Sequence, residues 1–270
     1  MSLPQFSRAT VATTSEDLHA SPLSSINHLA ETSSLRVRLA CNSTDRDAVY
    51  GLRYQVFNVE LGEGLKASCL SERDCDVYDT VCEHLLVEDI VTGEVVGTYR
   101  MQSGLTAGAH FGYYSEREFH FAPYEHLRPQ MLEIGRACIR KDYRALNVLM
   151  LLWRGIVLYA TQVSARYVIG CSSLNSTDVS SGSAMFATLR ERFLVEPELQ
   201  TAPTEEFSLQ IDTACTERTD PPRLLKSYLS VGAKICGPPA LDREFGTIDF
   251  LTLVDTEQLT SAARSRFFAC

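Results

Sequence analysis

Residues 131–157 combine side-chain types and spacings that suit chemistry on a thioester. An apolar run carrying one carboxylate and one guanidinium, Glu133 and Arg136, leads through a basic turn into a long amphipathic helix. Charged side chains inside an apolar run often mark a site, because burying them is costly. A basic turn at the start of a helix favours an anion. The layout indicates a site for a phosphate-bearing thioester.

Strand geometry sets a condition on this pair. Glu133 and Arg136 are three residues apart, so a regular strand would point them to opposite faces. We predict a β-bulge at or next to Gly135, which would turn both side chains toward one cleft and splay the strands there. A buried pair that serves only the structure is the alternative.

Composition limits the protein class. The chain has 270 residues, 45% hydrophobic and 22% charged, as expected for a globular protein with one elaborated domain. The net charge of -9 argues against a nucleic-acid partner. Yet residues 128–154 hold six cations and two anions. This basic island favours a specific anionic ligand or partner, with a solvated helix entrance as the alternative.

Metal and membrane sites are not indicated. The nine cysteines form no Cys-x-x-Cys pair and the six histidines show no ligand spacing, so we expect no metal and a reducing cytoplasm. The most hydrophobic stretch, 146–163, contains Arg154 and is shorter than the roughly 20 apolar residues needed to cross a bilayer. Peripheral contact with the inner membrane is allowed, but spanning is not.

The elements that position these side chains follow from periodicity and turn signals. Thr44 with Asp47 predicts a capped helix to about residue 59. The other predicted helices are 145–163, 184–193 and 222–231, and the predicted strands are 35–41, 84–88, 94–101, 131–139, 167–171, 233–236 and 247–254. We expect a flexible tail at 1–34, one domain at 35–255 and a C-terminal tail at 256–270.

Six motifs occur in the order of a known family. They are LRYQVF at 52–57, DVYDTVCEH at 76–84, LEIGRAC at 132–138, LWRG at 152–155, IGCSS at 169–173 and PPRLLKSYLSVGAKICG at 221–237. The ordered set resembles the GNAT acyltransferase superfamily and, within it, the bacterial L-ornithine N-alpha-acyltransferases of ornithine lipid synthesis, sometimes labelled hemolysin-like. The first half is also similar to acyl-homoserine-lactone synthases.

The resemblance implies an α/β fold of the GNAT type, a central mixed β-sheet flanked by helices and splayed at a bulged central strand. It implies transfer of a 3-hydroxyacyl group from acyl carrier protein to the α-amine of ornithine, giving lyso-ornithine lipid without a further cofactor. Three alternatives stay open: another amino-acid acceptor, acyl-homoserine-lactone synthesis, and a non-catalytic acyl-binding module.

The resemblance also suggests catalytic roles. An amine attacks the thioester carbonyl directly, and backbone N–H groups of the central strand stabilise the oxyanion. Because an α-amine is mostly protonated near neutrality, a carboxylate should take its proton, and Glu133 is the predicted base, with Arg136 beside it. Tyr228 is the predicted general acid for the departing thiolate, with a core position as the alternative.

The acceptor and the loop around it need further charges. Arg100 and Arg136 are candidates for the acceptor carboxylate, and Asp76 and Asp79 for a distal ammonium. Both aspartates could equally fix their loop through salt bridges. Arg53 and Phe57 are predicted to brace that loop or to wall the acyl tunnel.

The turn after the central strand points to the donor. It lacks the glycines with which acetyl-CoA users in the superfamily hold pyrophosphate. A carrier protein presents a single phosphodiester, which side-chain cations and a helix N-terminus suffice to hold. We therefore predict that Arg140, Lys141, Arg144 and Ala145 bind the phosphopantetheine and that the same cations dock an acidic carrier protein.

Overall fold

A mixed sheet forms the centre of the computed structural model, which describes residues 28–144, 146–261, 263 and 265. The strand order is β1-β2-β3-β4-β5-β6-β9-β7, with β8 paired to β9. The bounds are β1 His28–Glu31, β2 Leu35–Leu39, β3 Glu83–Asp89, β4 Val95–Ser103, β5 Met131–Ile139, β6 Tyr167–Leu174, β7 Lys234–Ile235, β8 Ala240–Asp242 and β9 Thr247–Asp255. Among these strands only β5 and β6 pair in parallel. The predicted mixed α/β fold is confirmed.

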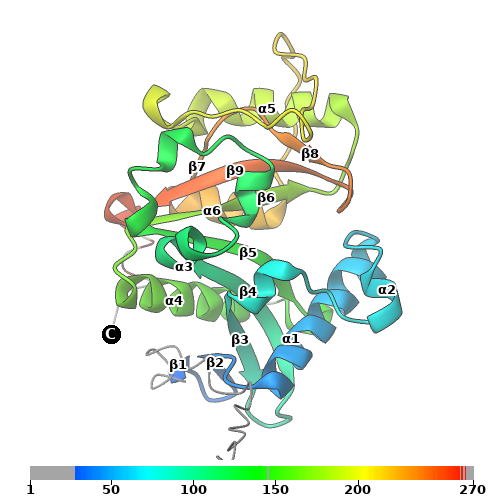
Figure 1. Cartoon of the computed structure of the whole chain (residues 1–270), viewed down its shortest axis with the longest axis vertical. Coiled ribbons are helices and arrows are strands. Elements are labelled where there is room, and N and C mark those ends of the chain that lie inside the picture. The colour runs from blue at the N-terminus through cyan, green and yellow to red at the C-terminus, as the bar shows by residue number, and fades with distance from the viewer. Residues whose placement is uncertain (1–27, 145, 262, 264, 266–270) are drawn as a thin grey trace, which may run out of the picture.

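Helices flank the sheet, as Figure 1 shows for α1 across its lower half and α5 along its upper edge. The α-helices are α1 Ser43–Tyr54, α2 Ser68–Ser71, α3 Gly104–Ala109, α4 Leu146–Gln162, α5 Val179–Phe193 and α6 Arg223–Val231. A π-helical segment, η1 Gln55–Leu61, continues α1. The 3-10 turns are η2 Val77–Thr80, η3 Tyr114–Arg117, η4 Ala122–Tyr124, η5 Arg128–Gln130, η6 Lys141–Tyr143, η7 Pro197–Leu199 and η8 Thr256–Gln258.

Strand alternation places α1 and α4 on opposite faces. Leu85 and Val87 of β3 are fully buried in the core under α4. A Cβ atom at Gly155 would lie 2.9 Å from the Leu85 side chain, so α4 approaches β3 closely there. His84 points to the other face, where its ring contacts Tyr50 of α1 at 5.4 Å between centroids. The two helices therefore bury both faces of this half of the sheet.

The sheet opens between β5 and β6. Their register pairs are Met131 with Tyr167, Leu132 with Val168, and Glu133 with Ile169, and the ladder ends there. β6 continues to Leu174 in pairing with β9 instead. The two strands thus share a three-pair seam and then diverge.

A β-bulge lies on β5 next to Gly135, as predicted. Arg100 of β4 pairs with Gly135 and Thr98 pairs with Cys138, so two residues of β5 oppose one of β4. Arg136 adopts a left-handed backbone with φ +49°, which is unfavourable for a residue with a Cβ atom. Glu133 and Arg136 both line one cavity as a result.

Several helices and strands differ from their predicted bounds. The helix predicted from Thr44 has its N-cap at Asn42, whose side chain accepts from the Asp45 N–H, because an earlier residue supplies the capping oxygen. The helix predicted from residue 184 begins at Val179, after the Asp178 cap, and the strand β8 was not predicted.

Both predicted tails include residues that belong to the folded domain. Strand β1 pairs with β2, so residues 28–31 of the predicted N-terminal tail belong to the sheet. Leu259 and Ala263 of the predicted C-terminal tail are buried in the core with α4. The prediction for residues 1–27 lies outside the described residues. In the part of the chain that the structure describes, every helix is too short or too polar to cross a membrane.

The seam predicts a stability effect at Gly170. A Cβ atom there would lie 2.1 Å from the Ile134 carbonyl oxygen, so Gly170→Ala must push β5 away from β6. We expect urea denaturation to show a loss of about 1–3 kcal/mol. Gly135→Ala is the matched control, since its Cβ would meet nothing within 4 Å. Equal stability of the two variants would contradict the close approach.

Candidate active site

A cavity of about 420 Å³ opens where β5 and β6 diverge. Residues 133–137 of β5 line it on one side and residues 168–175, mostly of β6, on the other. Trp153 of α4 and Tyr228 of α6 line it as well, and Tyr114 lines it from η3. The cavity therefore lies between two strands and is lined by a carboxylate and a guanidinium from the same strand, Glu133 and Arg136.

Glu133 is held in a fixed orientation at the end of the seam. Its Oε2 accepts from the Tyr114 N–H at 2.8 Å, and its Oε1 accepts from the Ser115 N–H at 2.9 Å and from the Ser115 hydroxyl. Burial raises the pKa of Glu133 above its ordinary value, although the bonds from Ser115 and Tyr114 act in the opposite direction. A raised pKa suits a carboxylate that must accept a proton during catalysis.

Arg136 does not pair with Glu133. Its guanidinium lies between two aromatic rings, 4.8 Å from the Tyr114 centroid and 4.7 Å from that of Phe245. Its Nη2 donates to Asp76 at 3.0 Å, and its Nε lies 3.4 Å from Asp74. These contacts hold the unusual backbone of the bulge in place.

A buried ionic cluster stands behind Arg136. Arg53 is fully buried and bonds to Asp74 at 2.7 Å and to Asp79 at 2.8 Å. Arg100 bonds to Asp76 at 2.7 Å and to Asp79 at 3.3 Å. Burial alone would raise the pKa of Asp79, but Arg100 and Arg53 hold it well below its usual range.

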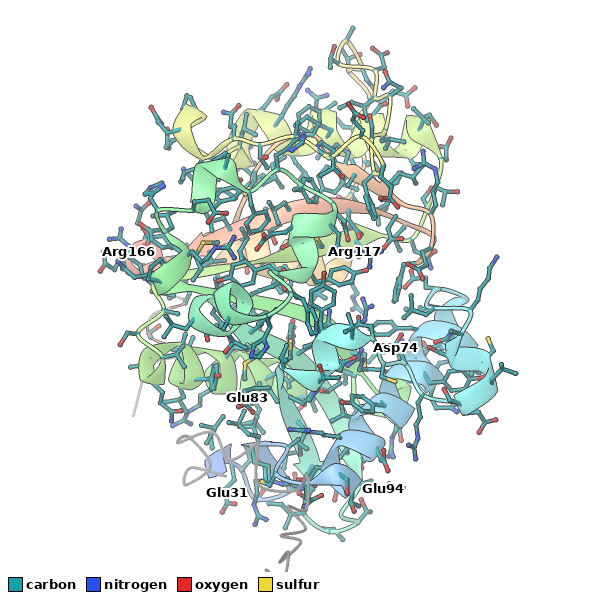
Figure 2. The ribbon with its side chains drawn as sticks, in the orientation of Figure 1. Glu31, Asp74, Glu83, Glu94, Arg117 and Arg166 are labelled. Carbon is teal, nitrogen blue, oxygen red and sulfur yellow. The ribbon has the colours of Figure 1, made fainter. Side chains whose placement is uncertain are left out.

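This cluster, defined as Arg53, Asp74, Asp76, Asp79, Arg100 and Arg136, is electrically balanced. Three guanidinium groups face three carboxylates, and burial lowers the pKa of the adjacent His84 to about 4, so that this imidazole is neutral. In Figure 2, Asp74 lies next to α1 in the lower half, and Arg117 lies toward the upper half, which carries β9. The contacts of Asp76 and Asp79 support the loop-bracing alternative, because both carboxylates are already neutralised by arginines.

Other predicted residues are also located. Arg53 braces the loop through the balanced cluster, whereas Phe57 lines the cavity. Tyr228 lines the cavity too, and its hydroxyl lies 2.6 Å from that of Tyr99. Its ring packs edge-on against Trp153 at 5.4 Å. Tyr228 therefore combines a core position with access to the cavity.

The basic turn is less free than its sequence suggests. Arg140 pairs with Glu94 at 2.9 Å and with Asp142 at 2.8 Å, and Arg144 bonds to Glu60 at 2.7 Å. Lys141 is exposed. Ala145 lies outside the described residues. Exposed ion pairs contribute little to stability. The two arginines can therefore release their carboxylate partners and bind an anion at a small cost in free energy.

A second group of acids was not predicted. We call Glu63, Glu118, Asp242 and Asp249 the acidic pocket: Glu63, Asp242 and Asp249 line the cavity, and Glu118 lies behind Cys171. Burial raises the pKa of Asp249 to about 6, with Asp242 adding to the shift. Burial also raises the pKa of Glu118, well above its ordinary value, with Asp249 and Asp242 contributing. The one signal in the sequence is Asp249 itself, an acid within the apolar strand 248–254.

Comparison with known proteins identifies the class. The fold and the split-strand cavity are those of an acyltransferase of the GNAT class, and residues 52–154 match the model of the acetyltransferase (GNAT) domain. Solved structures agree in fold: the acyl-homoserine-lactone synthase LasI has a TM-score of 0.51 and 12% identity, covering 88% of this chain and 96% of its own. FeeM, an N-acyl amino acid synthase from uncultured soil microbes, has a TM-score of 0.50 and 11% identity, covering 85% and 97%.

Sequence relatives identify the family. An L-ornithine N(alpha)-acyltransferase from Agrobacterium fabrum is 31% identical over 83% of this chain and 82% of its own length. One from Brucella abortus is 29% identical over 86% and 88%. The chain belongs to the L-ornithine N(alpha)-acyltransferase family, and it is an N-acyltransferase. The resemblance inferred from the ordered motifs is confirmed.

The balanced cluster predicts a large stability effect for one substitution. Arg53→Met would leave the fully buried Asp74 and the buried Asp79 short of a counter-ion, so we expect a loss of about 3–5 kcal/mol in urea denaturation. Arg73→Met is the control, because Arg73 pairs with Asp47 on the surface at 2.9 Å and such pairs contribute about 1 kcal/mol or less. Similar losses in both variants would show that the buried cluster is not structural.

Proposed function

We propose that this protein transfers a 3-hydroxyacyl group from acyl carrier protein to the α-amine of L-ornithine, giving lyso-ornithine lipid. The observation that carries the proposal is the cavity at the β5–β6 seam, which brings Glu133 and Arg136 together in a chain whose relatives are named for this acceptor. The direct transfer requires no cofactor of the protein. The proposal also places the protein in the cytoplasm, in peripheral contact with the inner membrane, because the product is amphiphilic.

The transfer follows from the geometry of the seam. The α-ammonium of the acceptor loses a proton to the Glu133 carboxylate, and the free amine attacks the thioester carbonyl carbon. A C–N bond forms, the carbonyl oxygen becomes an oxyanion, and backbone N–H groups of β5 beyond Glu133, where pairing with β6 has ended, stabilise it. The C–S bond then breaks as the oxyanion collapses, the attacking nitrogen gives up its second proton, and the departing thiolate takes up one proton, so that an amide and a thiol result.

Arg136 and Tyr228 have supporting roles in this step. Arg136 and Arg100 both line the cavity. Their charge is balanced by the aspartates, but among the described residues only Nη2 of Arg136 and Nη1 of Arg100 donate to them, so other N–H groups of the two guanidiniums could hydrogen-bond the acceptor carboxylate. Burial raises the pKa of Tyr228, so its hydroxyl keeps its proton near neutrality and can give it to the leaving thiolate. The Tyr99 hydroxyl, 2.6 Å away, holds that of Tyr228 in place, and the second proton released by the attacking nitrogen can restore the Tyr228 hydroxyl.

The basic turn would receive the donor. Arg140, Lys141 and Arg144 lie next to the N-terminal end of α4, where a helix favours an anion. Their surface position also suits contact with the acidic surface of a carrier protein.

Replacing Glu133 should abolish product formation with little change in fold. Glu133→Gln keeps the shape of the side chain but removes the base, so we expect kcat to fall by about 10²–10⁴-fold. The measurement is mass spectrometry of acyl-ornithine formed from purified acyl carrier protein thioester and ornithine, and of lipids from a host expressing each form. Glu205→Gln, an exposed residue, is the control.

Two outcomes would contradict the proposal. If the wild-type protein forms acyl-homoserine lactone, or another acyl amino acid in place of acyl-ornithine, L-ornithine is not its acceptor. An unchanged rate in Glu133→Gln would remove Glu133 as the base.

Reversing charge on the basic turn should weaken use of the carrier protein. For Arg140→Glu with Arg144→Glu we expect KM for the acyl carrier protein to rise about tenfold or more at low salt. The difference from wild type should shrink as salt is added, because surface charges are screened. Steady-state kinetics at several salt concentrations measures this.

A matched double variant tests the position of the charge. Arg36→Glu with Arg218→Glu makes the same change in net charge at exposed ion pairs elsewhere. An equal rise in KM for both double variants would show a general charge effect and would refute docking at this turn.

A further inference from the structure

The acidic pocket differs from the balanced cluster in having no counter-ion. None of its carboxylates has a lysine or arginine nitrogen within 4 Å among the described residues. The guanidinium groups of Arg117 and Arg136 are stacked on the Tyr114 ring, at 5.4 and 4.8 Å. Buried carboxylates repel one another, and a cation from outside the chain would relieve that repulsion.

Two oxygens in this pocket have free acceptor capacity. Oδ1 of Asp249 and Oε1 of Glu118 are buried and have no well-formed hydrogen bond among the described residues, although Ser173, Thr247 and Glu118 make weaker contacts with the Asp249 carboxylate. Asp249 is 4% exposed and lines the cavity, and Glu118 is fully buried. Unmet acceptors of this kind are costly in a folded protein, so they point to a ligand that donates hydrogen bonds.

The distance along β6 fits an amino acid with a second amine. Ile169 is the register partner of Glu133, and Cys171 stands two residues further, which is roughly 7 Å along a strand. The Cys171 thiol donates to Glu118 at 3.5 Å, so the Glu118 carboxylate lies at that level. The two nitrogens of extended ornithine are separated by five single bonds, roughly 6 Å.

We propose that Asp249 and Glu118, supported by Asp242 and Glu63, form the subsite for the distal ammonium of the acceptor, and that this subsite selects a diamino acid over a neutral one. The inference rests on the proposed function and deepens it. It gives the ammonium a place other than Asp76 and Asp79, whose charges the arginines already balance.

An ammonium fits this pocket better than a metal ion. The Glu118 carboxylate, the Asp249 carboxylate and the Cys171 thiol come close enough together to hold a metal. However, the Cys171 thiol donates to the Glu118 carboxylate at 3.5 Å, whereas a metal would need the thiolate. The carboxylates of Glu118 and Asp249 can then accept hydrogen bonds from the N–H groups of an ammonium.

The test compares ornithine with norvaline, which has the same carbon skeleton without the distal amine. We expect wild type to favour ornithine in kcat/KM, and Asp249→Asn and Glu118→Gln each to reduce that ratio on the order of 10- to 100-fold. The loss should be larger for ornithine than for norvaline, because norvaline lacks the amine that the pocket would bind. Glu205→Gln is again the control, and it should keep the wild-type ratio.

The pH dependence of the substrate ratio and the melting temperature of the variant distinguish this role from a purely structural one. The pKa of Asp249 is raised to about 6 in the free protein and bound ammonium favours the ionised form, so the ornithine-to-norvaline ratio should rise as pH increases through about 6. The α-amine and Glu133 act on both substrates and cancel in the ratio. Removing a buried charge should leave the melting temperature of Asp249→Asn equal to or above that of wild type.

The outcomes separate this inference from the proposed function. Wild type that favours ornithine while both variants keep the full preference would overturn the subsite but not the acyl transfer. Wild type that acylates no ornithine would overturn the proposed function. Stoichiometric zinc in purified wild type, with the preference lost on chelation, would make the pocket a metal site and overturn the ammonium assignment.

Discussion

The separation of β5 from β6 is the constraint on which the rest of this structure depends. A parallel pair that stops after three residue pairs gives up hydrogen bonds along its remaining length, and the left-handed Arg136 adds backbone strain. Both costs are offset by the contacts of the Arg136 guanidinium, which is held by Asp74 and Asp76 and stacked between two aromatic rings. The ionic cluster therefore helps to maintain the opening between the two strands.

Two groups of buried acids lie near the cavity and have different electrostatic character. Asp79, in the balanced cluster, is ionised and fully paired, so it fixes structure. Asp249 and Glu118 have raised pKa values and free acceptor atoms, so their charge state responds to what binds. Both groups are buried. The pKa of Asp79 and the pKa values of Asp249 and Glu118 shift in opposite directions because arginines contact the carboxylates of the balanced cluster and, among the described residues, do not contact those of the acidic pocket.

Much of the fold could be predicted from the sequence because its signals are local. The apolar run of β5, the amphipathic pattern of α4 and the turn before α6 fix those elements, and the three-residue spacing of Glu133 and Arg136 requires a bulge. Asn42, Ser43 and Thr44 can all cap a helix, so the start of α1 was misplaced by two residues.

The remaining features depend on contacts between distant segments. Arg144 meets Glu60 and Glu118 meets Asp249 only after the chain has folded, so local sequence does not indicate the neutralised turn or the acidic pocket. The three-pair seam has a further mechanical consequence. The halves of the sheet on either side of it carry Glu133 on one and Asp249 on the other, so the three pairs of the seam set the distance between these two carboxylates. A substitution that loosens this short parallel contact would therefore alter that distance without touching either carboxylate.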